Sequence, residues 1–148
     1  MTLTRTNSDN EDFQKLVEAL DIDLKIRDGN DNAFYAQFNK ITAIKHVIVA
    51  YESNFPVGCG AIKQYADDTM EVKRMYVSPE NRGQGIAGLI LGALEVWAKE
   101  LNYARCILET GQKQPEAIAL YKKQGYQIIS NYGQYEGIAN SVCFEKLL

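Results

Sequence analysis

The sequence predicts one α/β domain with a mainly antiparallel sheet, and three observations lead to this prediction. The chain has 148 residues, a length at which a single domain buries about 70% of the surface that its unfolded chain exposes. Three strand-like segments follow one another in the middle of the chain, and connections as short as theirs join antiparallel neighbours. A polar, glycine-containing loop then leads into a segment with helical periodicity. We therefore treat residues 1–148 as one domain.

The N-terminal part is expected to contain one strand and two helices. Residues 2–6 alternate as a strand does, and Ser8 with Glu11 forms a capping-box pattern that predicts the start of a helix. The apolar residues that follow at helical spacing are Phe13, Leu16, Val17 and Leu20. A second, short helix is predicted between Phe34 and Ile41, where aromatic and aliphatic side chains again recur at helical spacing.

The strand-like segments of the middle are residues 45–51, 57–65 and 70–77, which are separated by short turn-like sequences. Beyond the polar loop, the helical segment is marked by Ile86, Ile90, Leu94, Trp97 and Leu101.

The C-terminal part continues with a strand at 105–110 and a helix that Pro115 opens and Gly125 ends. The last strands are predicted at 126–129 and 141–147, with a loop between them.

Charge and cysteine content exclude several classes of function. The 16 Lys and Arg residues stand against 19 Asp and Glu residues, so the chain has no surplus of positive charge with which to bind nucleic acid. It has no apolar run of about 18 residues and no signal-peptide pattern, which favours a cytoplasmic protein that does not bind a membrane. We interpret Cys59, Cys106 and Cys143 as reduced core residues, and no metal site is predicted.

The loop at 78–85 has the features of an anion-binding site. A strand, a glycine-bearing loop and a helix in this order bring unpaired N–H groups and the positive end of the helix dipole to one place. Glycines allow a diphosphate to approach the backbone closely, and Arg82 could add a charge-assisted contact at the rim.

The segment Arg82-Gly83-Gln84-Gly85-Ile86-Ala87 resembles the R/Q-x-x-G-x-G/A coenzyme A signature of the GNAT acetyltransferases. Residues 72–79 resemble the strand and Pro-containing turn that precede this signature, and residues 117–126 resemble the later A-x-x-L-Y-x-x-x-G-F/Y segment. The similarity covers most of the chain from Val57 to Ile129. It implies an α/β fold in three layers, with a mixed, mainly antiparallel sheet of about seven strands and helices on both faces.

The resemblance also implies the function. The chain is expected to be an N-acetyltransferase that moves an acetyl group from acetyl-CoA directly to a primary amine of a small molecule or peptide. A domain that binds acyl-CoA as a sensor without turnover is the alternative from another class. The chain could act alone or as a homodimer.

The resemblance assigns the co-substrate acetyl-CoA to two groups of residues. Backbone groups around Met75, Tyr76 and Val77 contact the thioester and pantetheine, because the family's strand splays there. The residues expected to hold the pyrophosphate are Arg82, Gly83, Gln84, Gly85, Ile86, Ala87 and Gly88. Gln114 stands where many members of the family carry an Asn that bonds the pantetheine arm, and a Gln could make the same bond.

Acetyl transfer to an amine needs a base for the amine and an acid for the departing thiolate. Tyr121 lies at the family's proton-donor position, and a phenol is a reasonable acid toward a thiolate. Glu71 occupies the strand position from which several members use a glutamate as base, and Glu109 on the neighbouring strand is a second candidate. His46, the only histidine, starts a strand away from these motifs and is interpreted as structural.

Two other interpretations use the same loop. Residues 83–88 also match G-x-G-x-x-G, and Glu109 ends a strand about 20 residues later, where a dinucleotide fold would place its ribose-binding acid. However, residues 78–82 separate the first glycine from its strand, and hairpin-linked strands precede the motif, which disfavours a dinucleotide-binding oxidoreductase. A helix-capping loop that binds nothing is the other interpretation.

Overall fold

The computed structural model describes residues 1–29, 35 and 43–148. Its strands are β1 (Thr2–Thr6), β2 (His46–Glu52), β3 (Phe55–Ala66), β4 (Thr69–Val77), β5 (Arg105–Gly111), β6 (Gln127–Ile129) and β7 (Ser141–Leu147). Its α-helices are α1 (Glu11–Asp28), α3 (Ile86–Glu100) and α4 (Pro115–Lys123), and short 3-10 helices cover Pro79–Asn81 and Gly133–Tyr135. The strands predicted from the sequence agree with these bounds to within about two residues, whereas the predicted second helix, apart from Tyr35, lies outside the described residues.

The sheet has seven strands in the order β1-β2-β3-β4-β5-β7-β6. Only the β4–β5 pair is parallel, and the other neighbouring strands are antiparallel. This topology confirms the mixed, mainly antiparallel sheet. It differs from the open, mostly parallel sheet that a dinucleotide-binding fold requires.

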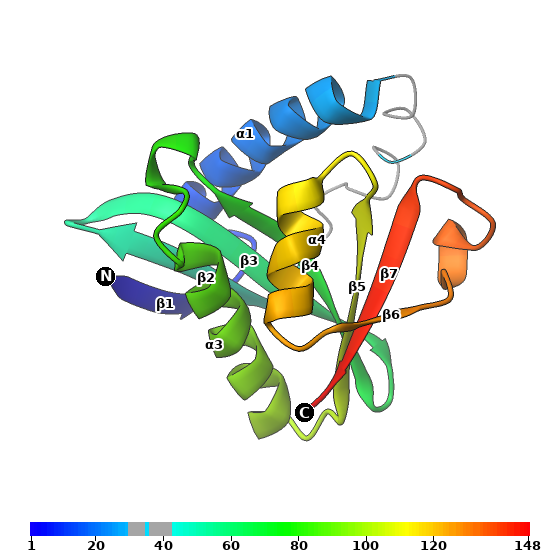
Figure 1. The fold of residues 1–148 in the computed structure, drawn as a ribbon. Coiled ribbons are helices and arrows are strands. Elements are labelled where there is room, and N and C mark those ends of the chain that lie inside the picture. The colour runs from blue at the N-terminus through cyan, green and yellow to red at the C-terminus, as the bar shows by residue number, and fades with distance from the viewer. Residues whose placement is uncertain (30–34, 36–42) are drawn as a thin grey trace.

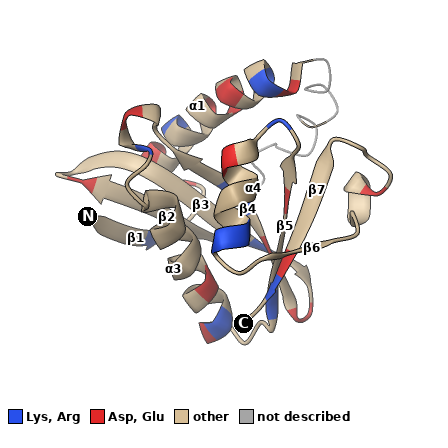
Figure 2. Ribbon diagram, viewed as in Figure 1, with Lys and Arg blue, Asp and Glu red and all other residues tan. Residues whose placement is uncertain are grey.

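The helices cover both faces of the sheet, which completes the three predicted layers (Figure 1). On one face, α1 buries Phe13, Leu16 and Val17 against side chains of β2 and β3. On the other face, α3 buries Ile90 and Leu94 in the larger core, together with residues of α4, β5 and β7. Acidic and basic residues are interspersed over the ribbon (Figure 2).

The N-terminus of α1 corrects one detail of the sequence analysis. The cap is Asn10, whose side-chain oxygen accepts a hydrogen bond from the Phe13 N–H at 2.9 Å. Ser8 instead exchanges two hydrogen bonds with Ile44, because its hydroxyl accepts from the Ile44 N–H and its own N–H donates to the Ile44 carbonyl. The predicted capping box is therefore wrong in its residue, and the helix begins two residues later than a cap at Ser8 would place it.

Gly60 on β3 allows the side chains of α3 and of Met75 on β4 to pack closely over the backbone of β3. A Cβ atom on Gly60 would lie 2.5 Å from the Met75 sulfur and 2.9 Å from side-chain atoms of Ile90 and Leu94. Opposite this glycine, the β3–β4 register shifts, and Arg74 adopts a φ of 60°. The shift is a β-bulge, a feature that bends a strand and turns its side chains in a new direction.

Strands β4 and β5 pair over a short stretch only. Their ladder consists of Thr69 with Arg105, Met70 with Cys106 and Glu71 with Ile107. Beyond Glu71 the two strands separate, so the edge of β4 that faces β5 is left outside the ladder. The predicted splay of this strand is present, and it begins before Met75.

Cys59, Cys106 and Cys143 are buried and form no disulfide, as predicted. Among the described residues, the helices are too short or too polar to cross a membrane.

Candidate active site

The loop between β4 and α3 presents an open backbone surface. Gly83 and Gly85 both have a φ of 79°, in the region that favours glycine. A Cβ atom built at either position would meet no atom within 4 Å. The lack of side chains at these two glycines therefore leaves free space directly above the backbone.

The N-terminus of α3 points into the same space. Gly85 is its N-cap and offers no side-chain cap, and the first N–H groups of an α-helix have no partner within the helix. The N–H groups of Ile86, Ala87 and Gly88 are therefore available to an anion, and the helix dipole adds to their attraction.

A pocket of about 300 Å³ opens above this loop. We call it the larger pocket. It is lined by all but one of the residues that we expect to hold the cofactor: Met75, Tyr76, Val77, Arg82, Gly83, Gly85, Ile86, Ala87, Gly88 and Gln114. Gln84 is the exception, since it does not line this pocket.

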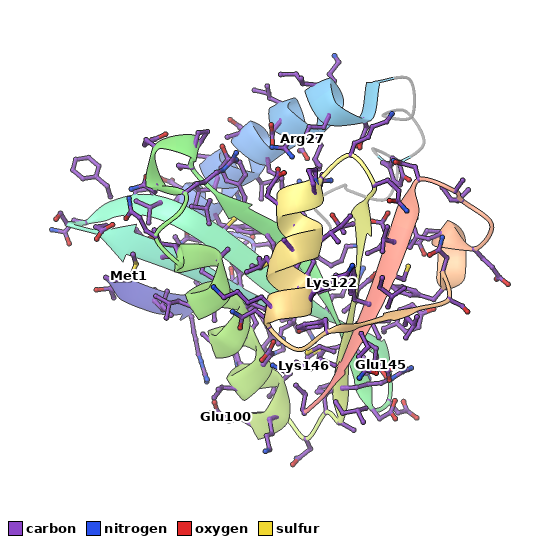
Figure 3. The ribbon with its side chains drawn as sticks, in the orientation of Figure 1. Met1, Arg27, Glu100, Lys122, Glu145 and Lys146 are labelled. Atoms are coloured by element: carbon purple, nitrogen blue, oxygen red, sulfur yellow. The ribbon has the colours of Figure 1, made fainter. Side chains whose placement is uncertain are left out.

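Two ion pairs between α1 and other elements lie in the lining of the larger pocket. Arg82 donates from Nε to the Val77 carbonyl at 2.8 Å, and its Nη2 lies 3.9 Å from Asp23 of α1. Arg27 of α1 pairs with Glu116 in the first turn of α4, and Figure 3 shows Arg27 between the two helices. Both arginines line the pocket together with their partners Asp23 and Glu116, so an anionic ligand there would compete with these carboxylates for the two guanidinium groups.

A smaller pocket of about 100 Å³ lies where β4 and β5 separate. Four residues line both pockets: Leu20, Met75, Gln114 and Tyr121. A ligand in the larger pocket and one in the smaller pocket would therefore share these walls.

Tyr121 is buried, with 6% of its surface exposed. Its ring packs against Tyr126 and Phe144, with centroids 5.9 and 5.8 Å away. Burial, and secondarily the charge of Glu109, raises the pKa of the Tyr121 phenol. The hydroxyl is therefore protonated at neutral pH and can act as a donor.

Glu71 lines the smaller pocket, but its carboxylate already has partners. Its Oε2 accepts a hydrogen bond from the Tyr132 hydroxyl at 2.6 Å, and its Oε1 lies 3.6 Å from the Lys73 ammonium. Burial, with the Glu71 charge, raises the pKa of Tyr132, so this phenol remains a donor to the carboxylate.

Glu109 lines the same pocket from β5, and one of its carboxylate oxygens, unlike those of Glu71, has no partner within the described part of the chain. Its Oε2 is buried and has no hydrogen-bond partner among the described residues. Burial raises the pKa of Glu109 to about 7, although a hydrogen bond with Ser141 acts in the opposite direction. A carboxyl group with a pKa near neutrality is suited to accept and release a proton.

Sequence analysis missed one charged residue of the smaller pocket, Arg74. Its side chain is only 3% exposed, and its Nη2 donates to Asp21 on α1 at 2.8 Å. Its Nε is buried without a partner among the described residues. The signal in the sequence was the pair of basic residues Lys73 and Arg74, which stands between apolar residues in a predicted strand.

His46 lies outside both pockets. Its ring meets Trp97 edge-on at a centroid distance of 4.8 Å, and burial lowers its pKa. These contacts agree with a structural role.

Comparison with known proteins gives a consistent result. The family model described as an acetyltransferase (GNAT) domain matches residues 43–128. An "IAA acetyltransferase" of Azospirillum brasilense is 41% identical over 105 residues, which make up 68% of this chain and 67% of that protein. Other curated relatives are matched over about half of their own length.

Two solved structures share the whole fold. A Klebsiella pneumoniae protein assigned as an acyl-CoA N-acyltransferase superposes with a TM-score of 0.83 at 30% identity, over 99% of this chain and 97% of that one. A GNAT family acetyltransferase from Elizabethkingia anophelis with acetyl-CoA bound superposes with a TM-score of 0.70 over 99% and 97% of the two chains. The latter is 18% identical, so its likeness concerns the fold alone.

Proposed function

The chain belongs to the GNAT acetyltransferase family and is an acyltransferase, and from this premise we propose that it moves an acetyl group from acetyl-CoA to a primary amine of a small molecule or peptide. The observation that carries the proposal is the pair of adjoining pockets with Tyr121 in the wall of both. One pocket suits an anionic nucleotide, and the other suits a small amine.

The residues of the larger pocket fit coenzyme A. Free space above Gly83 and Gly85, together with the unpaired N–H groups at the start of α3, suits its pyrophosphate. The edge of β4 that lies beyond its ladder with β5, and the side chain of Gln114, suit the pantetheine arm. Acetyl-CoA would supply the activated acetyl thioester at the junction of the two pockets.

The chain's own residues would then move protons. We infer that Glu109 removes a proton from the acceptor ammonium, since its Oε2 is free of partners and its pKa is about 7. Glu71, which the sequence favoured as base, is held by Tyr132 and Lys73 and would orient the site. Tyr121 would donate its proton to the departing sulfur.

Ligand binding and turnover test the proposal separately. Acetyl-CoA at 100 times its dissociation constant should add about 2.7 kcal/mol of stability and raise the melting temperature, whereas NADH should leave it unchanged. Release of free thiol in the presence of a panel of amines measures turnover. Stabilisation by NADH alone would contradict the proposed cofactor, and acetyl-CoA binding without thiol release from any amine would favour the sensor alternative.

A variant pair tests the placement of the pyrophosphate. Gly85→Val should abolish coenzyme A binding, because its side chain would occupy the space above the loop. Gly137→Val is the matched control, since Gly137 also has a positive φ, of 78°, and open space, but lies outside both pockets. We expect both variants to lose stability equally, and only Gly85→Val to lose coenzyme A binding. Unchanged affinity in folded Gly85→Val would place the phosphates elsewhere.

A further inference from the structure

We propose that the acceptor is a small amine that also carries a carboxylate, such as a free amino acid, with its amino group at Glu109 and its carboxylate at Arg74. This inference rests on the proposed acetyl transfer and names the class of amine. The observation behind it is that two oppositely charged side chains in one pocket each have a buried polar atom without a partner.

The two unpartnered atoms are Arg74 Nε and Glu109 Oε2. Among the described residues, these two are the only buried side-chain nitrogen or oxygen atoms without a hydrogen-bond partner. Leaving a buried charged group without a hydrogen bond is unfavourable, so such atoms often mark the place of a ligand. Both residues line the smaller pocket, and one ligand with both charges would satisfy both atoms.

The neighbouring charges do not compete for these atoms. Glu71 accepts from Tyr132 and lies 3.6 Å from Lys73, which leaves this pair largely neutral. Arg74 uses Nη2 for Asp21, and that bond leaves Nε available. Asp28 also lines the pocket and adds a third carboxylate on the side of α1.

The size of the pocket and the unpartnered Arg74 Nε favour an acceptor that is small and carries a carboxylate. At about 100 Å³, the pocket is well below the roughly 300–1,000 Å³ that drug-sized ligands occupy. A polyamine carries no negative group, so it would leave the buried Arg74 Nε without an acceptor, although Glu71, Glu109 and Asp28 also line the pocket. A carboxylate instead gains a charge-assisted hydrogen bond from Arg74.

Glu109 and Tyr121 together account for the protons that move during the transfer. The acceptor enters as an ammonium, and Glu109 takes one proton from its nitrogen. The nitrogen forms a bond to the acetyl carbon, and the bond between that carbon and sulfur breaks. Tyr121 donates a proton to the sulfur and is reprotonated by the second proton that leaves the nitrogen. The products are an N-acetylated acid, free coenzyme A and one proton released by Glu109.

The test compares each amino acid with its own amide, which keeps the amine and side chain but lacks the negative charge. Thiol release from acetyl-CoA is measured for the twenty common L-amino acids, their amides and two polyamines. The proposal expects at least one acid to exceed its amide in kcat/KM by about 10- to 100-fold, the effect of one charge-assisted hydrogen bond. Equal rates for acid and amide, or a preference for polyamines, would overturn it.

Arg74→Gln tests the residue that recognises the carboxylate. It should bring the ratio of acid to amide close to one, mainly through KM for the acid. The ratio compares two substrates of the same protein, so partial loss of folded enzyme cancels. Arg105→Gln is the matched control, since Arg105 is also a strand residue paired with a carboxylate, that of Glu145, but lies outside the pocket, and it should keep the ratio of the parent. An unchanged ratio in Arg74→Gln would remove Arg74 from recognition.

Calorimetry separates failure of this inference from failure of acetyl transfer. The same amino acids and amides are titrated into protein saturated with coenzyme A. Binding of an acid but not of its amide, without turnover, would support the acceptor class and contradict catalysis. Turnover of amides as fast as acids would do the reverse, and absence of binding by every amino acid would overturn the inference directly.

Discussion

At the scale of single residues, Tyr121 joins the two pockets, and its hydroxyl can be tested apart from its ring. Tyr121→Phe keeps the packing against Tyr126 and Phe144. We expect near-normal melting and acetyl-CoA affinity within a few-fold, with turnover lowered by roughly 10²- to 10⁴-fold, the usual contribution of one general acid. Steady-state kinetics measure this, with Tyr103→Phe outside the pockets as control. A rate within threefold of the parent would remove Tyr121 from the mechanism.

Glu109 should show opposite effects on stability and on activity. Its folded-state pKa is raised to about 7 by burial, so its ionisation destabilises the fold as the pH rises from the unfolded-state pKa through 7. Glu109→Gln removes this charge and should raise the melting temperature above pH 7, while lowering turnover by about 10²-fold or more. The parent's kcat/KM should rise with pH through about 7.

Glu71→Gln is the comparison for that experiment. It weakens the acceptor of the Tyr132 hydrogen bond and the pairing with Lys73, so it should lower the melting temperature rather than raise it. If Glu71→Gln abolished the pH dependence and Glu109→Gln kept it, the base would be Glu71, as the sequence favoured.

At the scale of elements, the docking of α3 on β3 depends on a missing side chain. In Gly60→Ala the added Cβ would crowd Met75, Ile90 and Leu94, and we expect a loss of roughly 1–3 kcal/mol from overpacking. Gly92→Ala is the matched control, since a Cβ there meets nothing within 4 Å and alanine is the better helix former by about 0.5–1 kcal/mol. Denaturant unfolding of both variants measures the difference. Equal stability would mean that the interface relaxes freely.

At the scale of the whole molecule, periodicity and turn spacing were enough to predict the order of strands and helices. Local patterns have short range, so they located the glycine loop and the strand before it. They could not show that Glu71 is held by Tyr132, a residue 61 positions away along the chain, or that Arg74 sits in a bulge. They also named Ser8 where Asn10 caps the helix, because either residue suits a cap. They also placed Gln84 among the cofactor-binding residues, because a sequence motif is contiguous. The residues that line a pocket need not be contiguous, and Gln84 does not line the larger pocket.

The short ladder between β4 and β5 has a consequence for cooperativity. The ladder between the two parts of the sheet has three residue pairs, and the N–H groups of Ala104 and Arg105 add hydrogen bonds to the Asp68 carbonyl at its end. With so short a connection, β5, β6 and β7 with α4 form a candidate unit for opening below the global free energy of unfolding. Amide hydrogen exchange should therefore be faster in this unit than in β2, β3 and β4. Coenzyme A, which would touch both β4 and α4, should slow it. Uniform exchange across all the strands in the free protein would show instead that side-chain packing alone makes the sheet one cooperative unit.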